Sequence, residues 1–163
     1  YSPDYVSDIG ERPSIDGDAV DSMVQLNDVA SRVAVAAGAA GATDVTGFGL
    51  LGHLGKMVAA SGVDTVLDVG NIAFISGARD FASDGVVPGG TRRNLSWISD
   101  QVDAGSYGEV DLLLLADAQT SGGLVFGVDK DKSADVCAEL LSENVSAAVV
   151  GETLAGDGKI SLR

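Results

Sequence analysis

The sequence is poor in cysteine, histidine and aromatic residues. It has one cysteine and one histidine among 163 residues, and only 5% of its residues are aromatic. A single cysteine, Cys137, excludes an intramolecular disulfide framework and indicates a reducing, cytoplasmic compartment. His53 and Cys137 together are too few for a zinc site, which takes three or four such ligands. Because aromatic rings are few, we expect a core built from Ala, Val, Leu and Ile.

Positive charge is scarce as well. Ten Lys and Arg residues oppose 24 Asp and Glu residues, which gives a formal net charge of −14 at pH 7. Such a surface repels nucleic acid and anionic membranes, and the adjacent pair Arg92–Arg93 is too small a basic patch to reverse that repulsion. The sequence has no apolar run long enough to span a bilayer and no secretory signal at its start. We therefore predict neither a nucleic-acid nor a membrane partner.

The length and the 45% hydrophobic content suit one domain with a proper core. Residues 1–18 contain two prolines and several acids without an apolar period, so we interpret them as a linker or arm. Residues 19–163 then form the domain. The first residue is Tyr1 rather than Met, and we expect the chain to begin partway through a longer protein whose N-terminal half is missing here.

Helical and strand patterns alternate along the domain. The clearest helix covers residues 19–37 and ends at glycines. The patterns further predict helices at 49–60, 72–82, 91–98 and 133–141, and strands at 63–69, 86–87, 124–128 and 147–150. Residues 110–116 fit either helix or strand, and 153–163 resemble a closing hairpin with its turn at 156–158. This order predicts an α+β fold with α/β-like layers, in which one mixed β-sheet is covered by helices.

The stretch ATDVTGFGLLGHL, residues 42–54, concentrates unusual chemistry. Asp44 is flanked by the hydroxyls of Thr43 and Thr46, and Gly47 and Gly49 follow. We predict a short extended segment, a tight glycine turn and a helix, whose N-terminus suits a phosphate. A carboxylate just before such a turn suits Mg²⁺, which prefers oxygen ligands. The alternative is a buried turn capped by Asp44, with glycines needed only for geometry.

The same stretch contains a formal dinucleotide fingerprint. Residues 47–52 read GFGLLG, and Asp68 follows about 20 residues later, where a ribose-binding acid is expected. Two features oppose this alternative: residues 41–46 are small and polar, whereas a first Rossmann strand is an apolar run, and a long helix precedes them. A Walker A loop is excluded because no Lys-Ser/Thr follows the glycines.

Two further loops carry glycines and polar groups. In residues 88–94, PGGTRRN, two arginines follow glycines that leave backbone N–H groups exposed. Because Arg binds phosphate bidentately, Arg92 and Arg93 are candidates for a phosphate contact. Alternatively, they neutralise nearby acids. Residues 119–123, QTSGG, either line a second side of a ligand site or are only the turn that leads into the next strand. We interpret His53 as a satisfied helix residue behind the turn rather than a general base, and Cys137 as a core residue.

Three segments, ATDVTGFGLLGH, PGGTRRN and DAQTSGGL, occur in an order and spacing that closely resemble the C-terminal half of the selenophosphate synthetase (selenide, water dikinase) family. The resemblance runs from about the Met23 helix to the C-terminus. It implies membership of a superfamily that includes the aminoimidazole ribonucleotide synthases. One departure is Ala118, where the family often has proline, which should alter a turn and leave the chemistry unchanged.

The resemblance implies an ATP- and Mg²⁺-dependent enzyme that makes selenophosphate from selenide, ATP and water and releases AMP and phosphate. It implies two α/β halves, a homodimer formed mainly by the N-terminal halves, and ATP bound largely there, beside a catalytic Cys or Sec and a Lys. The family aspartate that helps bind Mg²⁺ matches Asp44. The corresponding nucleotide- or phosphate-binding candidates are Thr46, Gly47, Gly49, Arg92 and Arg93.

On this basis the chain itself contains no catalytic residue, because Cys137 does not match the family's catalytic position. We predict that the isolated chain is inactive and that its partner is the N-terminal half of the same protein. Two alternatives stay open: a dinucleotide-binding domain, and a non-catalytic binding module derived from such a synthetase.

Overall fold

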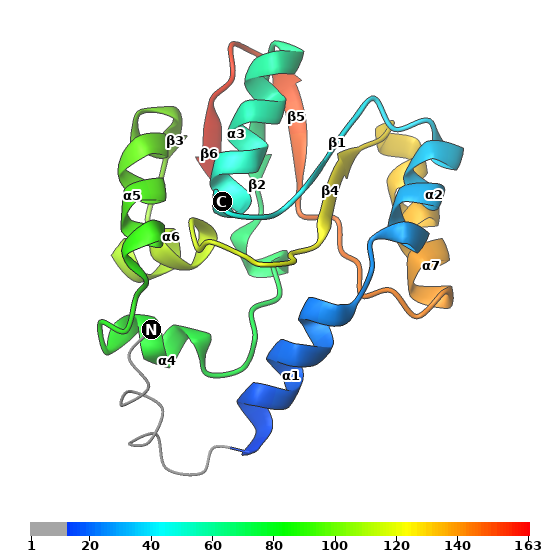
Figure 1. Cartoon of the computed structure of the whole chain (residues 1–163). Coiled ribbons are helices and arrows are strands. Elements are labelled where there is room, and N and C mark those ends of the chain that lie inside the picture. The colour runs from blue at the N-terminus through cyan, green and yellow to red at the C-terminus, as the bar shows by residue number, and fades with distance from the viewer. Residues whose placement is uncertain (1–12) are drawn as a thin grey trace.

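A computed structural model describes residues 13–163 of the chain (Figure 1). In chain order the elements are α1 (Pro13–Val24), α2 (Asp28–Ala37), β1 (Gly41–Asp44), α3 (Gly49–Ser61), β2 (Val63–Leu67), η2 (Val69–Asn71), α4 (Ala78–Ser83), α5 (Gly89–Ile98), η3 (Ser99–Gln101), β3 (Val102–Asp103), α6 (Glu109–Leu115), β4 (Leu124–Gly127), η4 (Lys130–Lys132), α7 (Ser133–Ser142), β5 (Gly151–Ala155) and β6 (Ile160–Leu162).

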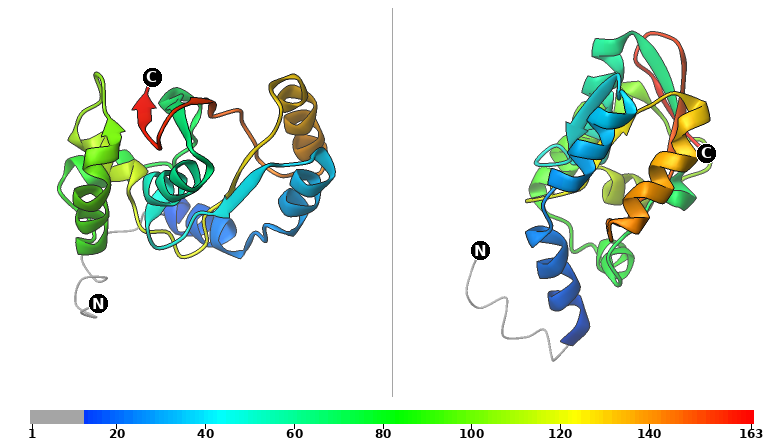
Figure 2. Two further views of the ribbon diagram at one scale, coloured as in Figure 1. Left: turned by 90° about the horizontal axis from the view of Figure 1, so that it is seen from above. Right: turned by 90° about the vertical axis from the view of Figure 1, so that its right-hand side faces the viewer.

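The strands form two sheets. The larger has the order β3-β6-β2-β5, with β2 parallel to β6 and antiparallel to β5. The smaller is an antiparallel ribbon of β1 and β4. Seen from above, α5 and α6 lie at one end, α3 and the larger sheet in the middle, and α2 and α7 at the other end (Figure 2). The ribbon therefore connects the middle of the molecule to the α2–α7 pair.

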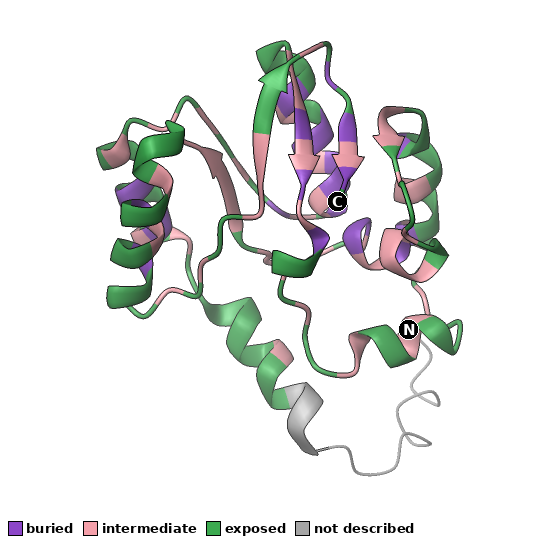
Figure 3. Cartoon of the chain, turned by 180° about the vertical axis from the view of Figure 1, so that it is seen from behind, coloured by how far each residue is buried: buried purple, intermediate pink, exposed green. Residues whose placement is uncertain are grey.

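The main core lies between α3 and one face of the larger sheet. Its buried side chains include Leu51, Leu54 and Val58 of α3 and Leu67 and Ile160 of the sheet. Burying each such side chain contributes roughly 1.5–3 kcal/mol. The opposite face of this sheet has no helix over it (Figure 3). Helices therefore cover one side of the sheet.

A second, smaller core holds α2 to α7. Ala30 and Val33 of α2 and Val136 and Leu140 of α7 are buried against one another. Leu124 and Phe126, alternate residues of β4, pack on this cluster, whereas the intervening Val125 packs on the main core. The two faces of the β1–β4 ribbon thus serve two different cores, as expected from the alternation of side chains along a strand.

The fold class is confirmed: the chain is α+β, with a mixed sheet. The glycine ends of two helices are confirmed too, because Gly38 and Gly62 follow α2 and α3 with left-handed φ values of 77° and 63°. The ambiguous run 110–116 is helical, as α6. The expectation of a single sheet is wrong, because β1 and β4 pair apart from the others.

The N-terminal elements differ from the sequence-based expectation. The helix predicted over residues 19–37 is two helices, and Asn27 in the break donates its Nδ2–H to the carbonyl of Gly122 (3.2 Å), which ties the break to a distant loop. Residues 13–18 belong to α1, so the prediction that they are irregular is wrong. Pro13 occupies the first helical position, where its missing N–H is not needed. Residues 1–12 of the expected arm lie outside the described residues, and the division into arm and domain stays a prediction.

Four predictions for the chain after residue 70 are wrong. The helix expected over 72–82 covers only Ala78–Ser83, because Gly77 takes a left-handed φ of 81° just before it. Residues 86–87 and 147–150 are not strands; the latter run crosses from the smaller core, contacted by Ala147, to the main core, contacted by Val150. The closing hairpin is absent, because β2 lies between β5 and β6.

Candidate functional site

The stretch from β1 to α3 has the predicted form: an extended segment, a turn and a helix. After β1 the main chain is hydrogen-bonded to the residues just before β4. Val45 N–H donates to Gly123 O (2.9 Å), and Gly122 N–H donates to Val45 O (2.9 Å). The turn closes where Gly49 N–H donates to Thr46 O (2.9 Å). Gly49 has φ 68°, a value that L side chains rarely adopt, so a glycine is required at this position.

Asp44 and Thr43 point to opposite faces of the ribbon. Asp44 pairs with Leu124, whose face packs toward α2 and α7, and Thr43 pairs with Val125, whose face packs toward α3. The Asp44 side chain is exposed, and within residues 13–163 its carboxylate accepts no hydrogen bond and joins no ion pair. The N-cap of α3 is Phe48, without a side-chain cap. The interpretation of Asp44 as a capping residue is therefore wrong, and its carboxylate is available.

The three motifs meet around the glycine turn. Asn94, from the PGGTRRN segment, donates its Nδ2–H to Gly47 O (2.9 Å) and to Ala116 O (3.1 Å). From the DAQTSGG segment, Gln119 N–H donates to Thr46 O (3.1 Å). Segments separated by more than 40 residues in the chain therefore hold one turn in place by hydrogen bonds to its backbone.

A second set of contacts fixes those two segments to each other. The hydroxyl of Thr91, which is 1% exposed, donates to Asp117 Oδ1 (2.6 Å), and Gln119 Nε2–H donates to Asp117 Oδ2 (2.9 Å). Both carboxylate oxygens of Asp117 are thus engaged inside the protein. The sequence predicts Thr91 as the cap of the following helix, which is wrong, because α5 begins at Gly89 with Pro88 as its N-cap. The roles of Asn94 and Asp117 could not be predicted from the sequence, because their contacts depend on tertiary structure.

The two arginines lie on α5 and are exposed. Arg92 pairs with Glu109 of α6 (3.3 Å), which agrees with the alternative that it neutralises a nearby acid. Arg93 folds back toward the N-terminus of α5: a Cβ added at Gly89 would lie 3.6 Å from its Nη1. No carboxylate in the described part of the chain pairs with Arg93. Within residues 13–163 neither guanidinium forms an ion pair with Asp44, and the predicted phosphate-binding role of the two arginines stays a prediction.

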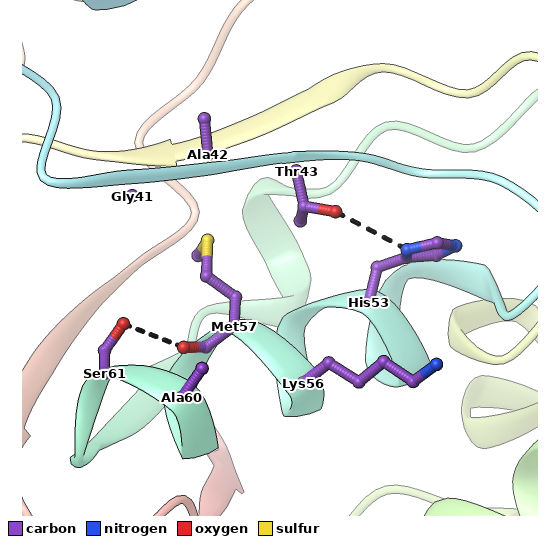
Figure 4. A pocket seen from close by; sticks show the side chains of 8 residues that line it. All are labelled: Gly41, Ala42, Thr43, His53, Lys56, Met57, Ala60 and Ser61. Carbon is purple, nitrogen blue, oxygen red and sulfur yellow. Dashed lines mark hydrogen bonds between the residues drawn. The ribbon is translucent and has the colours of Figure 1, made fainter.

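His53 lies one turn into α3, beside the ribbon. Its Nε2 is 2.9 Å from Thr46 Oγ1, and its Nδ1 is 3.5 Å from Thr43 Oγ1. The ring also lies 5.7 Å from the ring of Phe48. The interpretation of His53 as a satisfied helix residue is confirmed. Next to it is an open, mainly apolar hollow of about 370 Å³ between β1 and α3 (Figure 4), lined by Gly41, Ala42, Thr43, His53, Lys56, Met57, Ala60 and Ser61.

Exposed aromatic rings flank this hollow. Phe48 and Trp97 are 45% and 51% exposed, and their ring centroids are 5.9 Å apart. The Lys56 amino group lies 4.0 Å from the centroid of Phe48 and 5.5 Å from that of Trp97, close enough for cation–π attraction. The Lys56 amino group is thus within reach of both rings at once.

The topology argues against a dinucleotide site at GFGLLG. The strand before this motif, β1, and the strand after its helix, β2, lie in different sheets, so they do not form the parallel βαβ unit that such sites use. Asp68, the expected ribose-binding acid, forms a two-pronged ion pair with Arg163 (2.7 and 3.0 Å).

The carboxylates with shifted pKa values lie away from the turn. Backbone N–H groups, chiefly that of Lys159, lower the pKa of Asp64, whose Oδ1 accepts three of them at 2.8–3.0 Å. The guanidinium of Arg163 lowers the pKa of Asp68, and Lys130 chiefly lowers that of Glu152. These groups fix the β5–β6 connection and the C-terminal end of the sheet.

Asp44 suits one position in the coordination of a hard cation, because it is an exposed carboxylate without a competing partner. Within residues 13–163 no group of three or more His, Cys, Asp or Glu residues is placed to hold a metal ion. Asp44 therefore fits as a single ligand, and the described residues do not supply the others. No helix in this part of the chain has the length and apolar character that a membrane crossing would need.

Comparison with known proteins gives a consistent result. The family model described as "AIR synthase related protein, C-terminal domain" matches residues 9–162. The chain is 41% identical over 143 residues to a selenide, water dikinase of Carboxydothermus hydrogenoformans, covering 86% of this chain and 41% of that protein. The protein of the same name from Yersinia pseudotuberculosis is 37% identical over 151 residues, covering 93% of this chain and 43% of that protein. The one from Porphyromonas gingivalis is 38% identical over 135 residues, covering 82% of this chain and 38% of that protein. The chain spans about two-fifths of the length of these relatives.

Proposed function

The chain belongs to the AIR synthase related protein, C-terminal domain family, and we propose that it is the C-terminal part of an enzyme that makes selenophosphate. In this proposal the whole protein uses selenide, ATP and water and releases AMP and phosphate. The similarity to selenide, water dikinases supports the reaction. The lengths of those relatives support the existence of a further segment, which acts as the partner of this chain.

The observation that carries the proposal is the free carboxylate of Asp44 at the point where three motifs meet. Asp44 contributes one ligand to Mg²⁺, and the partner segment contributes the rest. Bound Mg²⁺ supplies charge neutralisation for the phosphates in phosphoryl transfer. The turn formed by Thr46, Gly47 and Gly49 sets the direction of the carboxylate.

Of the two arginines, Arg93 is the better candidate for a phosphate contact. Arg92 is already paired with Glu109, whereas Arg93 has no carboxylate partner among the described residues. Its guanidinium also lies near Gly89 and Gly90, at the N-terminus of α5, which favours anions. We therefore assign the phosphate contact to Arg93 and a structural ion pair to Arg92.

The proposal also explains why the isolated chain should be inactive. Its one cysteine, Cys137, lies on α7 with Sγ 3.5 Å from Ala147 O, in the layer that forms the smaller core. It is placed as a packing residue, so the family's catalytic Cys or Sec and Lys belong to the partner segment. We further propose that the whole protein is a cytoplasmic homodimer, since a single cysteine suits a reducing compartment.

The test measures AMP release that depends on both ATP and selenide in the full-length protein. We expect Asp44→Asn to abolish turnover and to leave thermal unfolding unchanged, because within residues 13–163 the carboxylate forms no hydrogen bond or ion pair. Asp135→Asn is the matched control, since Asp135 is an exposed acid on α7. Wild-type turnover in Asp44→Asn would remove Asp44 from the site. AMP release by the isolated 163-residue chain would contradict the division of roles.

A further inference from the structure

We infer that His53 is a positioning residue for Asp44. Its imidazole lies against the two threonine hydroxyls that flank Asp44 in the sequence, one on each side. Fixing Thr43 and Thr46 to α3 fixes the backbone between them, and so sets the direction of the carboxylate. This inference rests on the proposed function, because it assigns His53 a role in binding Mg²⁺ through Asp44.

The geometry makes the two contacts unequal. The separation of 2.9 Å between Nε2 and Thr46 Oγ1 is that of a good hydrogen bond, whereas 3.5 Å between Nδ1 and Thr43 Oγ1 is at the outer limit. The ring is also held from the side by Phe48, at 5.7 Å between centroids. Most of the positioning therefore depends on Nε2 and Thr46.

The placement of the ring suits a positioning role better than a role in direct contact with a ligand. Thr43 faces α3 and its residue His53 (Figure 4), whereas Asp44, the next residue of β1, faces the other side of the ribbon. The imidazole therefore supports the backbone from behind and does not compete for the metal. Loss of a residue that orients a metal ligand in this way typically lowers metal affinity or activity by roughly 10- to 100-fold.

The first experiment examines the contact itself in the 163-residue chain. His53 is the only histidine, so the ¹⁵N spectrum of the imidazole contains a single side chain and needs no assignment. We expect Thr46→Val to shift the Nε2 resonance more than the Nδ1 resonance, because the substitution removes the partner of Nε2 and keeps that of Nδ1. Unchanged ¹⁵N shifts in Thr46→Val would overturn the inference.

The second experiment compares two substitutions at His53 in the full-length protein. The amide of Gln reaches the position of Nε2, and the shorter Asn reaches only that of Nδ1. We expect His53→Gln to behave as the wild type. We expect His53→Asn to raise the Mg²⁺ concentration for half-maximal rate roughly 10-fold, with kcat at saturating Mg²⁺ changed by less than about 2-fold.

Glu139→Gln and Glu139→Asn are the matched controls, because Glu139 is exposed on α7, away from the glycine turn, and the pair shows what Gln and Asn do at an exposed helix position. Equal Mg²⁺ dependence in His53→Asn and wild type would overturn the inference and leave the proposed function intact. A wild-type protein without selenide-dependent AMP release would refute the proposed function and, with it, the role of His53 in that reaction.

Discussion

The turn that carries Asp44 is held by close contact of backbone with backbone, and Gly49→Ala tests this contact. Gly49 has φ 68° and lies against the end of α6: an added Cβ would be 2.5 Å from the carbonyl carbon of Ala116 and 2.7 Å from Asp117 O. Those atoms belong to the main chain, which cannot move aside as a flexible side chain does. The substitution therefore combines an unfavourable φ with a steric overlap.

Gly62 separates the two effects. It has nearly the same φ, 63°, and an added Cβ would meet nothing within 4 Å. Alanine in this conformation costs about 1 kcal/mol. The steric overlap at Gly49 costs about 1–3 kcal/mol more. We expect the free energy of unfolding to fall by about 1 kcal/mol in Gly62→Ala and by about 2–4 kcal/mol in Gly49→Ala.

Urea denaturation of the chain measures the difference. Trp97 is the only tryptophan and lies against Phe48 beside the turn, so its fluorescence reports on this region, and far-UV circular dichroism reports on the whole. With an m-value of about 2 kcal/mol/M, the midpoint should fall by about 0.5 M in Gly62→Ala and by about 1–2 M in Gly49→Ala. Equal midpoints in the two variants would refute the reasoning, because the overlap would then cost nothing.

Two further predictions concern contacts of the turn and of the sheet. Asn94→Ala leaves the carbonyls of Gly47 and Ala116 without their side-chain donor, and should lower the free energy of unfolding in urea by about 1–3 kcal/mol; a change below about 0.5 kcal/mol would contradict this role. The pKa of Asp64 is lowered in the folded state, chiefly by the N–H of Lys159, so the stability that it contributes is present above its ordinary value of 3.8 and is lost as the pH falls through the lowered value. The urea midpoint should therefore drop between about pH 5 and about pH 3 in the wild type and drop less in Asp64→Asn, and parallel curves for the two proteins would contradict the assignment.

Local sequence signals predicted the part of the fold that depends on local geometry. Helices that end at Gly38 and Gly62 were predicted because glycine is the residue that adopts the left-handed conformation cheaply. The extended segment, turn and helix around Asp44 follow from the same kind of signal. These elements form because of neighbours close in sequence, so one sequence is enough to find them.

The pairing of strands depended on distant contacts and was not predictable in the same way. Residues 153–163 contain the turn of a hairpin, but β2 lies between the two strands. The carboxylate of Asp64, in β2, binds the backbone of the connecting turn at residues 157–159. A turn that normally joins paired neighbours here wraps around the end of a third strand, which no local pattern reveals.

The candidate site shows the same division. The sequence placed Asp44 just before a glycine turn and left open whether its carboxylate binds Mg²⁺ or caps the turn. The structure has it exposed and without a partner among the described residues. The supporting residues were missed, because Asn94 and Asp117 act through hydrogen bonds to groups 22–47 residues away. The roles of Thr46, Gly47, Gly49 and both arginines in binding stay predictions.

The opposite orientation of Asp44 and Thr43 on the ribbon has a consequence for the energetics of assembly. His53, on the α3 side, and the main-chain hydrogen bonds of Val45 and Thr46 restrict the backbone around Asp44, whereas within residues 13–163 the carboxylate itself has no partner. The conformational entropy of the segment is therefore lost when the domain folds, before any ligand or partner arrives. In the proposed role of Asp44, binding is then rigid-body docking onto a pre-organised group, which keeps the entropic penalty small.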